Sequence, residues 1–343
     1  MTEVVERRRS RLLARLVIGL VAAWAVFVLL HEIFDGRWWF WLVPTMAPPL
    51  VLVVVPLLLL VAVLLIRAGR VALLVVVATL VVCADQSGLN PAAVLPSPAA
   101  PADGVRVFTW NTQYWDQKDD PAHFYEFLKR QNADVYLLQE HIHSYDGVIT
   151  PTDQEARIRQ EFPGYHVVVR GELVTLSRFP VVSVPPIDVD EGMEHAAELM
   201  RVDVLTPRGP LTLYNVHILV QMDPRSPLTS EFYRFFRERS AGRRMQFDQL
   251  TGDIGNNPAP SLVAGDFNTS PIMGDIDRMR AVATDAIGAN RSLYPVSWNA
   301  ESGLRFWRLD WVFTRRLKVH TYEFTDPEGM SDHYAQSLVM TVE

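Results

Sequence analysis

The segment Gly265-Asp266-Phe267-Asn268 follows a short apolar run and places a carboxylate two residues before a carboxamide. Residues two apart on an extended backbone point the same way, so Asp266 and Asn268 are predicted to face one phosphate group. Near the C-terminus, Asp310 lies inside the apolar run Leu309–Phe313, and Ser331-Asp332-His333 supplies an adjacent acid and imidazole. Oxygen ligands bind Mg²⁺, and carboxylates or imidazoles can move the protons of a water molecule. These segments predict hydrolysis of a phosphate ester with a hard divalent cation.

Three upstream segments share this design. Each places a polar residue just after a short β-rich apolar run, where the rim of a sheet presents functional groups. The segments are Phe108-Thr109-Trp110-Asn111, Leu137-Leu138-Gln139-Glu140 and Tyr214-Asn215-Val216-His217.

In this order the six segments resemble the endonuclease/exonuclease/phosphatase superfamily, which includes DNase I-like nucleases, inositol-phosphate phosphatases and neutral sphingomyelinases. The resemblance extends from Val105 to Val342, and the stretch Gly171 to Pro180 stands in the expected place between the second and third segments. It implies that residues 105–343 form a catalytic domain of the α/β (α+β) class, a four-layer α/β/β/α sandwich. Alternating predicted strands and helices agree with two packed sheets flanked by helices.

The resemblance also implies a metal site. Glu140 and Asn111 would hold Mg²⁺, with Mn²⁺ as the alternative, and Asp332 would reach the metal or its water. A carboxylate at the end of an apolar strand is costly unless it meets a cation or an arginine, which agrees with the role of Glu140. Gln113 stands where some family members carry a further acid, so a second metal ligand is not expected there.

The catalytic roles follow from the same resemblance. Asp266 would orient or deprotonate the attacking water, and Asn268 would contact the phosphoryl oxygens, although an Asx-turn is the ordinary structural role of Asp-x-Asn. Asp310 would accept a hydrogen bond from His333 and fix its tautomer. His217 would be the second imidazole, acting as an acid or a phosphate ligand.

Substrate binding is assigned to Asn215 and Arg178, with anchoring of a strand-to-turn junction as the open alternative for Arg178. His141 and His143 resemble a His-x-His metal pair, but a loop on the substrate side is the stronger interpretation. The arginines and aromatic residues of Arg225 to Arg244 favour a helix with buried rings and a solvated basic face. A surface that captures anionic lipid headgroups is the alternative.

The first 84 residues are predicted to be a membrane region with about three transmembrane helices. The apolar stretches are Leu16–Leu30, Met46–Ile66 and Val71–Ala84, of which the third is short for a span of about 20 residues. Arginines at Arg7–Arg11 and Arg67–Arg70 would stay in the cytoplasm, which places the catalytic domain outside. Two spans would instead place that domain in the cytoplasm.

Residues 85–104 are rich in proline and alanine and are predicted to form an extended linker. About 18 residues in polyproline geometry reach at most about 55 Å. The catalytic domain would therefore remain close to the bilayer. The single cysteine, Cys83, excludes a disulfide framework and a cysteine-based metal site.

Charge bears on the substrate. Residues 101–343 carry 24 basic and 34 acidic residues, a net charge of −10, whereas residues 1–100 carry a net charge of +3. Such an acidic domain lacks the broad basic footprint of most nucleic-acid binders, so nucleic acid is disfavoured without being excluded.

The combined prediction is a membrane-anchored, Mg²⁺-dependent hydrolase at the outer face of the cell membrane. Its architecture is similar to the actinobacterial teicoplanin-resistance type, which implies a lipid-linked polyprenyl pyrophosphate or a related membrane phosphate ester as substrate. The alternatives are a surface endonuclease or exonuclease, and a phospholipid phosphodiesterase of the sphingomyelinase type. A non-catalytic binding module is disfavoured because Glu140, Asp266 and His333 are all present, and no obligate protein partner is expected.

Overall fold

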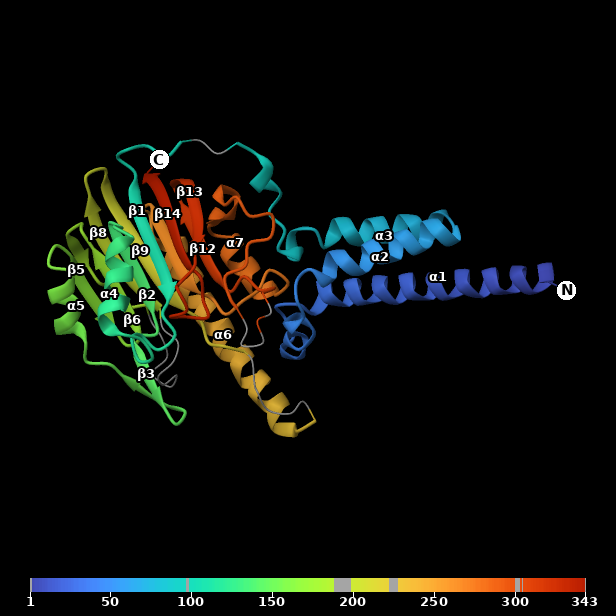
Figure 1. Cartoon of the computed structure of the whole chain (residues 1–343), viewed down its shortest axis with the longest axis horizontal. Coiled ribbons are helices and arrows are strands. Elements are labelled where there is room, and N and C mark those ends of the chain that lie inside the picture. The colour runs from blue at the N-terminus through green and yellow to red at the C-terminus, as the bar shows by residue number, and fades with distance from the viewer. Residues whose placement is uncertain are drawn as a thin grey trace. The chain divides into compact units, whose positions relative to one another are not determined.

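The computed structural model describes residues 2–96, 99–187, 199–221, 228–299, 303 and 305–342. The chain divides into two compact units. The first contains Met1–Leu89 together with Ser270–Gly274, and the second contains Asn90–Thr269 together with Asp275–Glu343. Figure 1 shows helices in the first unit and the sheets in the second.

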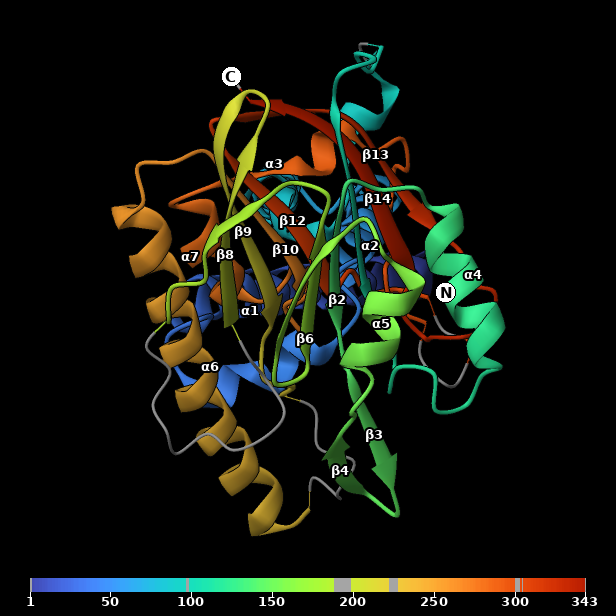
Figure 2. The same cartoon turned by 90° about the vertical axis from the view of Figure 1, so that its left-hand side faces the viewer.

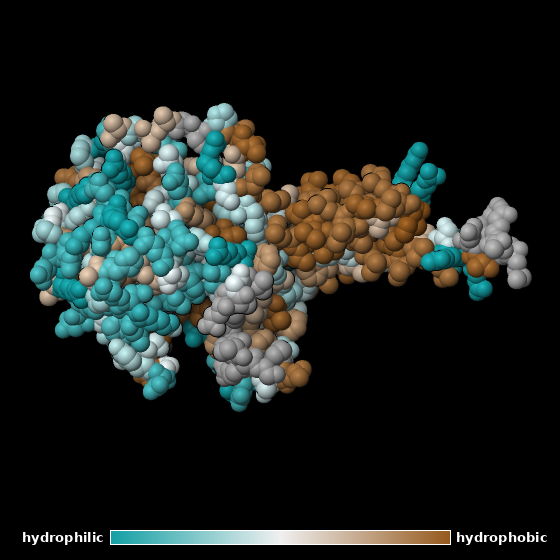
Figure 3. Space-filling view, in the orientation of Figure 1, coloured by the Kyte–Doolittle hydropathy of each residue, from teal (hydrophilic) through white to brown (hydrophobic). Residues whose placement is uncertain are grey.

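The helical unit contains α1 (Thr2–Phe34), α2 (Val51–Ile66) and α3 (Arg70–Val82), and two short 3₁₀ turns precede α2. Apolar residues cover the exposed surface of these helices (Figure 3). A small cluster that includes Val17, Val63 and Val76 packs the helices together. Their composition is therefore apolar both inside and outside, as in membrane helices.

The expected three spans are not all supported. Within the described residues, only Arg8–Phe34 is a single helix long and apolar enough to cross a membrane. The second stretch does not form one straight helix, because Trp39–Met46 and Val51–Ile66 meet at a bend of 64°. The third, α3, has 13 residues and rises only about 20 Å, less than the roughly 30 Å hydrocarbon core. The structure thus has one spanning candidate, or two if the bent pair crosses together.

The Pro/Ala-rich segment is not a free extended linker over its first half. Asp85–Ser87 and Pro91–Val94 form 3₁₀ turns. Between them Asn90 is only 2% exposed, and its Nδ2 donates to three backbone carbonyls of residues 287–292 at 2.9–3.3 Å. The Asn90 side chain thus docks this segment on residues 287–292, a contact that its Pro/Ala-rich composition does not predict. The reach of about 55 Å is therefore not available to these residues; Ser97 and Pro98 lie outside the described residues.

The catalytic unit is built on two six-stranded sheets. The first sheet has the order β13-β14-β1-β2-β6-β5 and the second β11-β12-β10-β9-β8-β7. The strands of the first are β1 (Val105–Asn111), β2 (Val135–Gln139), β5 (His166–Arg170), β6 (Leu173–Ser177), β13 (Leu317–Thr325) and β14 (Ala335–Val342). Those of the second are β7 (Val181–Ser183), β8 (Leu199–Thr206), β9 (Gly209–His217), β10 (Ser261–Asp266), β11 (Thr284–Asp285) and β12 (Asp310–Arg315).

Four layers result, as expected. Apolar side chains of both sheets form the central core, which includes Leu137, Leu213 and Leu262. Helices α4 (Pro121–Arg130) and α5 (Glu155–Glu161) cover the first sheet over a cluster rich in aromatic rings. Helices α6 (Ser230–Asn256) and α7 (Asp277–Arg280) cover the second. Figure 2 shows the two pairs of helices on opposite sides of the sheets.

The sequence Asp119-Asp120-Pro121 predicts the start of a helix, and α4 confirms it. Asp120 caps the helix by accepting a hydrogen bond from the N–H of Ala122, and Pro121 occupies the first turn.

The apolar runs Tyr165–Arg170, Leu173–Ser177 and Val181–Pro185 predict a three-stranded meander. This prediction is wrong in its last strand, because β7 pairs with β8 of the second sheet instead of with β6. Strand alternation alone does not specify which sheet a short edge strand joins.

One hairpin was not foreseen: β3 (Ile142–Tyr145) pairs with β4 (Val148–Pro151) and extends from the edge of the domain (Figure 2). Its sequence lacks apolar alternation, so periodicity gives no strand signal.

The register brings the motif ends together. Strands β1 and β2 run parallel and place Asn111 opposite Gln139, beside Glu140. Strands β9 and β10 also run parallel and place His217 opposite Asp266, which pairs in turn with Asp310 on β12. Because each parallel pair ends at the same edge of its sheet, polar residues far apart in sequence meet at one rim.

Candidate active site

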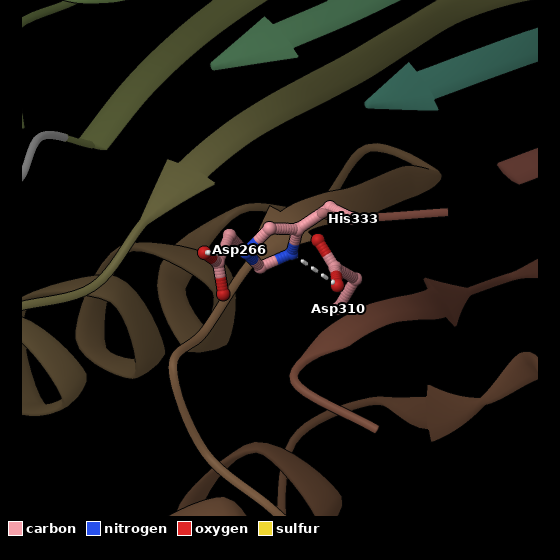
Figure 4. A group of neighbouring side chains, drawn as sticks. All are labelled: Asp266, Asp310 and His333. Atoms are coloured by element: carbon pink, nitrogen blue, oxygen red, sulfur yellow. Dashed lines mark hydrogen bonds and ion pairs between the residues drawn. The ribbon is translucent and has the colours of Figure 1, made fainter. Parts of the chain in front are cut away.

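A buried carboxylate holds one of the two imidazoles. The Nδ1 atom of His333 lies 2.8 Å from Oδ2 of Asp310, the hydrogen bond that the sequence predicted (Figure 4). The Ser297 hydroxyl donates to the same oxygen at 2.6 Å and accepts the N–H groups of Leu309 and Asp310. Ser297 thus fixes the carboxylate that orients the ring; no motif marked this serine in the sequence.

The second imidazole has its own carboxylate, which sequence analysis missed. Nδ1 of His217 lies 2.9 Å from Oε1 of Glu172, and both side chains are buried. Among the described residues no group donates a directed hydrogen bond to the Glu172 carboxylate, so the His217 ring is its counter-charge. An acid directly before the fully buried strand Leu173–Ser177 was the available signal, equivalent to that of Glu140 after β2.

Asp266 lies at the centre of the site. Its Oδ2 is 3.7 Å from Nε2 of both His217 and His333. The same oxygen accepts a hydrogen bond of 3.0 Å from Nδ2 of Asn111, which also donates to Oε1 of Glu140 at 3.0 Å. One amide therefore holds the two carboxylates side by side, and the two imidazoles flank one of them.

Asn268 does not lie on extended backbone as predicted. It adopts a left-handed conformation with φ 46°, and its N–H donates to Oδ1 of Asp266 at 2.7 Å. This is the Asx-turn alternative. Its side-chain amide donates to the carbonyl of Ile218 at 2.9 Å, so Asn268 joins two loops of the site.

Gly265 explains the tight approach of β10 to β9. Its φ is 141°, and a Cβ atom there would lie 2.0 Å from the Val216 carbonyl oxygen. Any larger residue would separate the strands next to Asp266 and His217.

Glu140 is held by a left-handed turn. Gln113, Tyr114 and Trp115 have φ values of 51°, 71° and 54°, and Glu140 itself has φ 61°. The N–H of Tyr114 donates to Oε2 of Glu140 at 3.0 Å. Consecutive left-handed residues are strained, and such strain concentrates at functional sites. The pKa of Glu140 is raised, chiefly because its carboxylate is buried.

Asp332 lies at the rim, half-buried. Its Oδ2 accepts a hydrogen bond of 2.9 Å from the indole of Trp298, and its Oδ1 lies 3.9 Å from Nε2 of His333. Its N–H donates to the side chain of Gln113 at 3.2 Å. Trp298 carries no sequence signal as a site residue, because its partner is 34 positions away.

The surrounding carboxylates raise the pKa of both imidazoles. Burial alone lowers the pKa of His217, but Glu172, Asp266 and Glu140 outweigh it and raise the pKa to about 10. Burial also lowers the pKa of His333, but Asp310 and Asp266 outweigh this effect and raise that pKa well above its ordinary value. Burial raises the pKa of Asp310 to about 6.

The donor set fits a hard cation. Five carboxylates meet two imidazoles at this rim, which leaves an excess of oxygen donors: Glu140, Glu172, Asp266, Asp310 and Asp332. Among the residues that the structure describes, ligand atoms of Asp266, Asp310 and His333 all lie within 4.8 Å of one another. This group differs from the predicted set of Glu140, Asn111 and Asp332. Carboxylate-rich sites of this kind suit Mg²⁺ or Mn²⁺.

The two predicted substrate-binding residues are not brought to the rim. Arg178 follows β6 at the opposite end from Glu140, where it donates to Asp134 at 3.0 Å and stacks on Tyr165. Its contacts are those of the anchoring alternative. Asn215 is fully buried between the sheets, where it accepts from Gln139 at 2.6 Å and donates to the carbonyls of Leu138 and Val174. It joins the sheets instead of facing substrate.

The His-x-His pair is structural in its contacts. His141 is buried edge-on against Trp115 and bonds Thr152 at 2.6 Å, and burial lowers its pKa to about 4. His143 lies 3.4 Å from Asp116. The segment Arg225 to Arg244 was predicted to form a helix with buried rings, and Phe232 and Phe236 of α6 are indeed buried. Arg225 lies outside the described residues.

The four-layer sandwich and the two imidazole–carboxylate pairs at its rim define a phosphoesterase of the DNase I-like class. The chain belongs to the endonuclease/exonuclease/phosphatase family, whose model matches residues 108–333. Members of this family hydrolyse phosphate esters. No curated protein sequence matches the chain.

Solved structures agree with the fold. A truncated TDP2 from Caenorhabditis elegans is 18% identical, with TM-score 0.52, over 71% of this chain and 100% of that one. The 3′ phosphatase NExo from Neisseria, bound to a product DNA hairpin, is 13% identical, with TM-score 0.52, over 68% and 98%. The human Nocturnin catalytic domain is 14% identical, with TM-score 0.50, over 71% and 97%. At these identities the likeness establishes the fold alone.

Proposed function

We propose that this protein is a membrane-anchored, Mg²⁺-dependent phosphoesterase that attacks a phosphate ester or phosphoanhydride with water. The observation that carries the proposal is the position of Asp266, whose Oδ2 lies 3.7 Å from both buried imidazoles and shares the amide of Asn111 with Glu140. A phosphoryl group at this rim would meet a base, two cationic rings and the carboxylates that hold a divalent ion.

The roles follow from the contacts. Asp266 accepts the proton of the attacking water, because its Oδ2 lies between the two imidazoles that would contact the phosphoryl group. His333, oriented by Asp310, and His217, oriented by Glu172, stabilise the developing phosphoryl charge and supply the proton to the leaving oxygen. Glu140 and Asp266 are the carboxylates that would hold the divalent cation, which supplies charge neutralisation and Lewis acidity when bound. No residue at the rim needs to form a covalent intermediate.

The proposed substrate is a lipid-linked phosphate, with a polyprenyl pyrophosphate as the leading example. Two features support a membrane substrate: the apolar helix Arg8–Phe34 and the net charge of −10 in residues 101–343, which disfavours a nucleic-acid polyanion. A tether raises the effective concentration of the site near the bilayer. The lipid bilayer is thus a proposed partner, and the catalytic domain is proposed to face outward.

A substrate panel tests the proposal. Purified full-length protein in detergent with Mg²⁺ would be offered polyprenyl pyrophosphate, sphingomyelin, plasmid DNA and inositol phosphates. We expect release of inorganic phosphate from the first, loss of activity in EDTA, and a loss on the order of 10²-fold in Glu140→Gln. Glu161→Gln, at the surface end of α5, is the matched control and should retain the rate.

The outcomes separate the alternatives. Preferred cleavage of DNA identifies a nuclease, and preferred cleavage of sphingomyelin identifies a lipid phosphodiesterase. Full activity in excess EDTA contradicts the metal-dependent mechanism. For orientation, protease added to intact spheroplasts should cut the exposed part of residues 96–104 and release the domain; cleavage only after permeabilisation would assign the domain to the cytoplasm.

A further inference from the structure

One arginine is completely buried beneath the site. Arg243 lies on α6, which packs along the outer face of the second sheet (Figure 2). Its side chain is 0% exposed. Phe247, Leu250 and Ile254 on the same buried face of the helix are apolar, and Gln246 beside them accepts the N–H of Leu219 at 3.0 Å. An arginine in such a place is costly unless its donors are satisfied, so its partners indicate its purpose.

The guanidinium spans two catalytic loops. Nη1 donates to the carbonyl of Leu219 at 2.6 Å and approaches the carbonyl of Phe267 at 3.5 Å. Nη2 donates to the hydroxyl of Thr269 at 2.6 Å. Leu219 lies two residues after His217, and Phe267 lies between Asp266 and Asn268. One planar fork therefore joins the loop that follows β9 to the loop that follows β10.

Two further contacts complete the set. Nε lies 3.2 Å from Oδ2 of Asp275, and Nη1 also donates to Gln221 at 3.2 Å. Among the residues that the structure describes, Asp275 is the one carboxylate within ion-pair distance of Arg243. The other donors bind loop carbonyls, a hydroxyl and an amide. The apolar residues of α6 already pack the helix on the sheet. The planar guanidinium adds hydrogen bonds of fixed geometry, which a lysine ammonium does not supply.

This geometry matters because Asp266 and His217 do not bond to each other. Nε2 of His217 and Oδ2 of Asp266 are 3.7 Å apart, so the separation of the two side chains is set by the pairing of β9 with β10 and by the loops that continue from these strands. Two hydrogen bonds of 2.9 Å already join the loops here: the N–H of Ile218 donates to the Asp266 carbonyl, and Nδ2 of Asn268 donates to the Ile218 carbonyl. The guanidinium adds a third cross-link, one residue further along each loop. A shift of about 1 Å at a reacting group can reduce a rate about 10²-fold.

We propose that Arg243 is a positioning residue that fixes the distance between the His217 loop and the Asp266–Asn268 loop. The proposal rests on the proposed phosphoesterase function for its kinetic consequence. Arg243 touches neither substrate nor metal; it acts through the two loops.

The test compares two arginines that tie α6 to the same sheet. Arg243→Lys keeps the charge next to Asp275 but loses the fork. Arg201→Lys is the matched control, since Arg201 on β8 bonds Asp253 of α6 at 3.1 Å through the same kind of pair. We expect kcat of Arg243→Lys to fall about 10- to 100-fold with KM changed less than about threefold, whereas Arg201→Lys retains kcat.

Two more readouts distinguish positioning from general destabilisation. Added guanidinium should partly restore kcat in Arg243→Ala, whose cavity matches the missing group. Hydrogen exchange should rise in peptides that cover residues 214–221 and 266–270 of Arg243→Lys, and not elsewhere. This readout does not depend on activity. If the wild type hydrolyses none of the panel, the proposed function fails while exchange still decides the role of Arg243.

Wild-type kcat in Arg243→Lys, or unchanged exchange in both loops, would overturn the inference. Equal losses of kcat and melting temperature in the two lysine variants would also overturn it, because any arginine that ties α6 to the sheet would then have the same effect.

Discussion

Asp310→Asn isolates the charge of one site carboxylate. In the structure Oδ2 of Asp310 accepts both the Ser297 hydroxyl at 2.6 Å and Nδ1 of His333 at 2.8 Å. A carboxamide oxygen can take the place of that single atom and keep both bonds. The substitution therefore preserves the packing and removes only the negative charge.

The expected effect follows from the type of bond that is lost. A hydrogen bond to a charged group contributes about 1.5–3 kcal/mol, and a neutral one about 0.5–1.5 kcal/mol. Burial lowers the pKa of His333, and Asp310 is the principal group that raises it, so the cationic ring loses its main support. Exchange of the charged bond for a neutral one therefore removes about 1–1.5 kcal/mol of stabilisation in the transition state, a decrease of about 5- to 10-fold in kcat/KM.

The assay measures kcat/KM on the best panel substrate and the melting temperature of the same samples. Asp285→Asn is the control, because Asp285 is a part-buried aspartate of the same sheet whose partner is Arg308, at 2.7 Å, instead of a histidine. It should lower the melting temperature and leave kcat/KM nearly unchanged. Asp310→Asn with wild-type kcat/KM would refute a catalytic role of the dyad and leave Asp310 a structural residue.

Further outcomes follow from single contacts. Gly265→Ala should lower the free energy of unfolding by at least about 2 kcal/mol, because its Cβ would meet the neighbouring strand. Gly252→Ala, on the open surface of α6, is the control and should raise it by about 0.5–1 kcal/mol. Chemical denaturation measures both changes. Asn90→Ala should free the Pro/Ala segment and speed its limited proteolysis, and an unchanged cleavage rate would mean that the segment is held by other contacts. Glu172→Gln should reduce kcat/KM about tenfold by weakening the support of His217, and equal rates in steady-state kinetics would contradict this.

Several candidate site residues could be predicted from the local sequence. Asn111, Glu140, His217 and Asp266 each end or follow a buried strand, and His333 lies two residues before β14, so local sequence marks them. Strands of a sandwich end at common edges, and the register of two parallel pairs carries these residues to one rim.

Other residues of the site depend on contacts that no local pattern encodes. Glu172, Ser297 and Arg243 have their partners 45, 13 and 22 or more positions away, and each looks like an ordinary strand, loop or helix residue in the sequence. Arg178 resembled a phosphate ligand only because its position along β6 was unknown; the antiparallel register places it at the far end.

The sequence by itself determined the order of the motifs, the strands that carry them and the apolar character of the N-terminal helices, because these depend on residue type and spacing along the chain. Tertiary structure alone decided the turn at Asn268, the docking of Asn90 and the pairing of His217 with Glu172. Those features are hydrogen bonds and ion pairs between distant segments, and they form only where folding has removed water from the groups that make them.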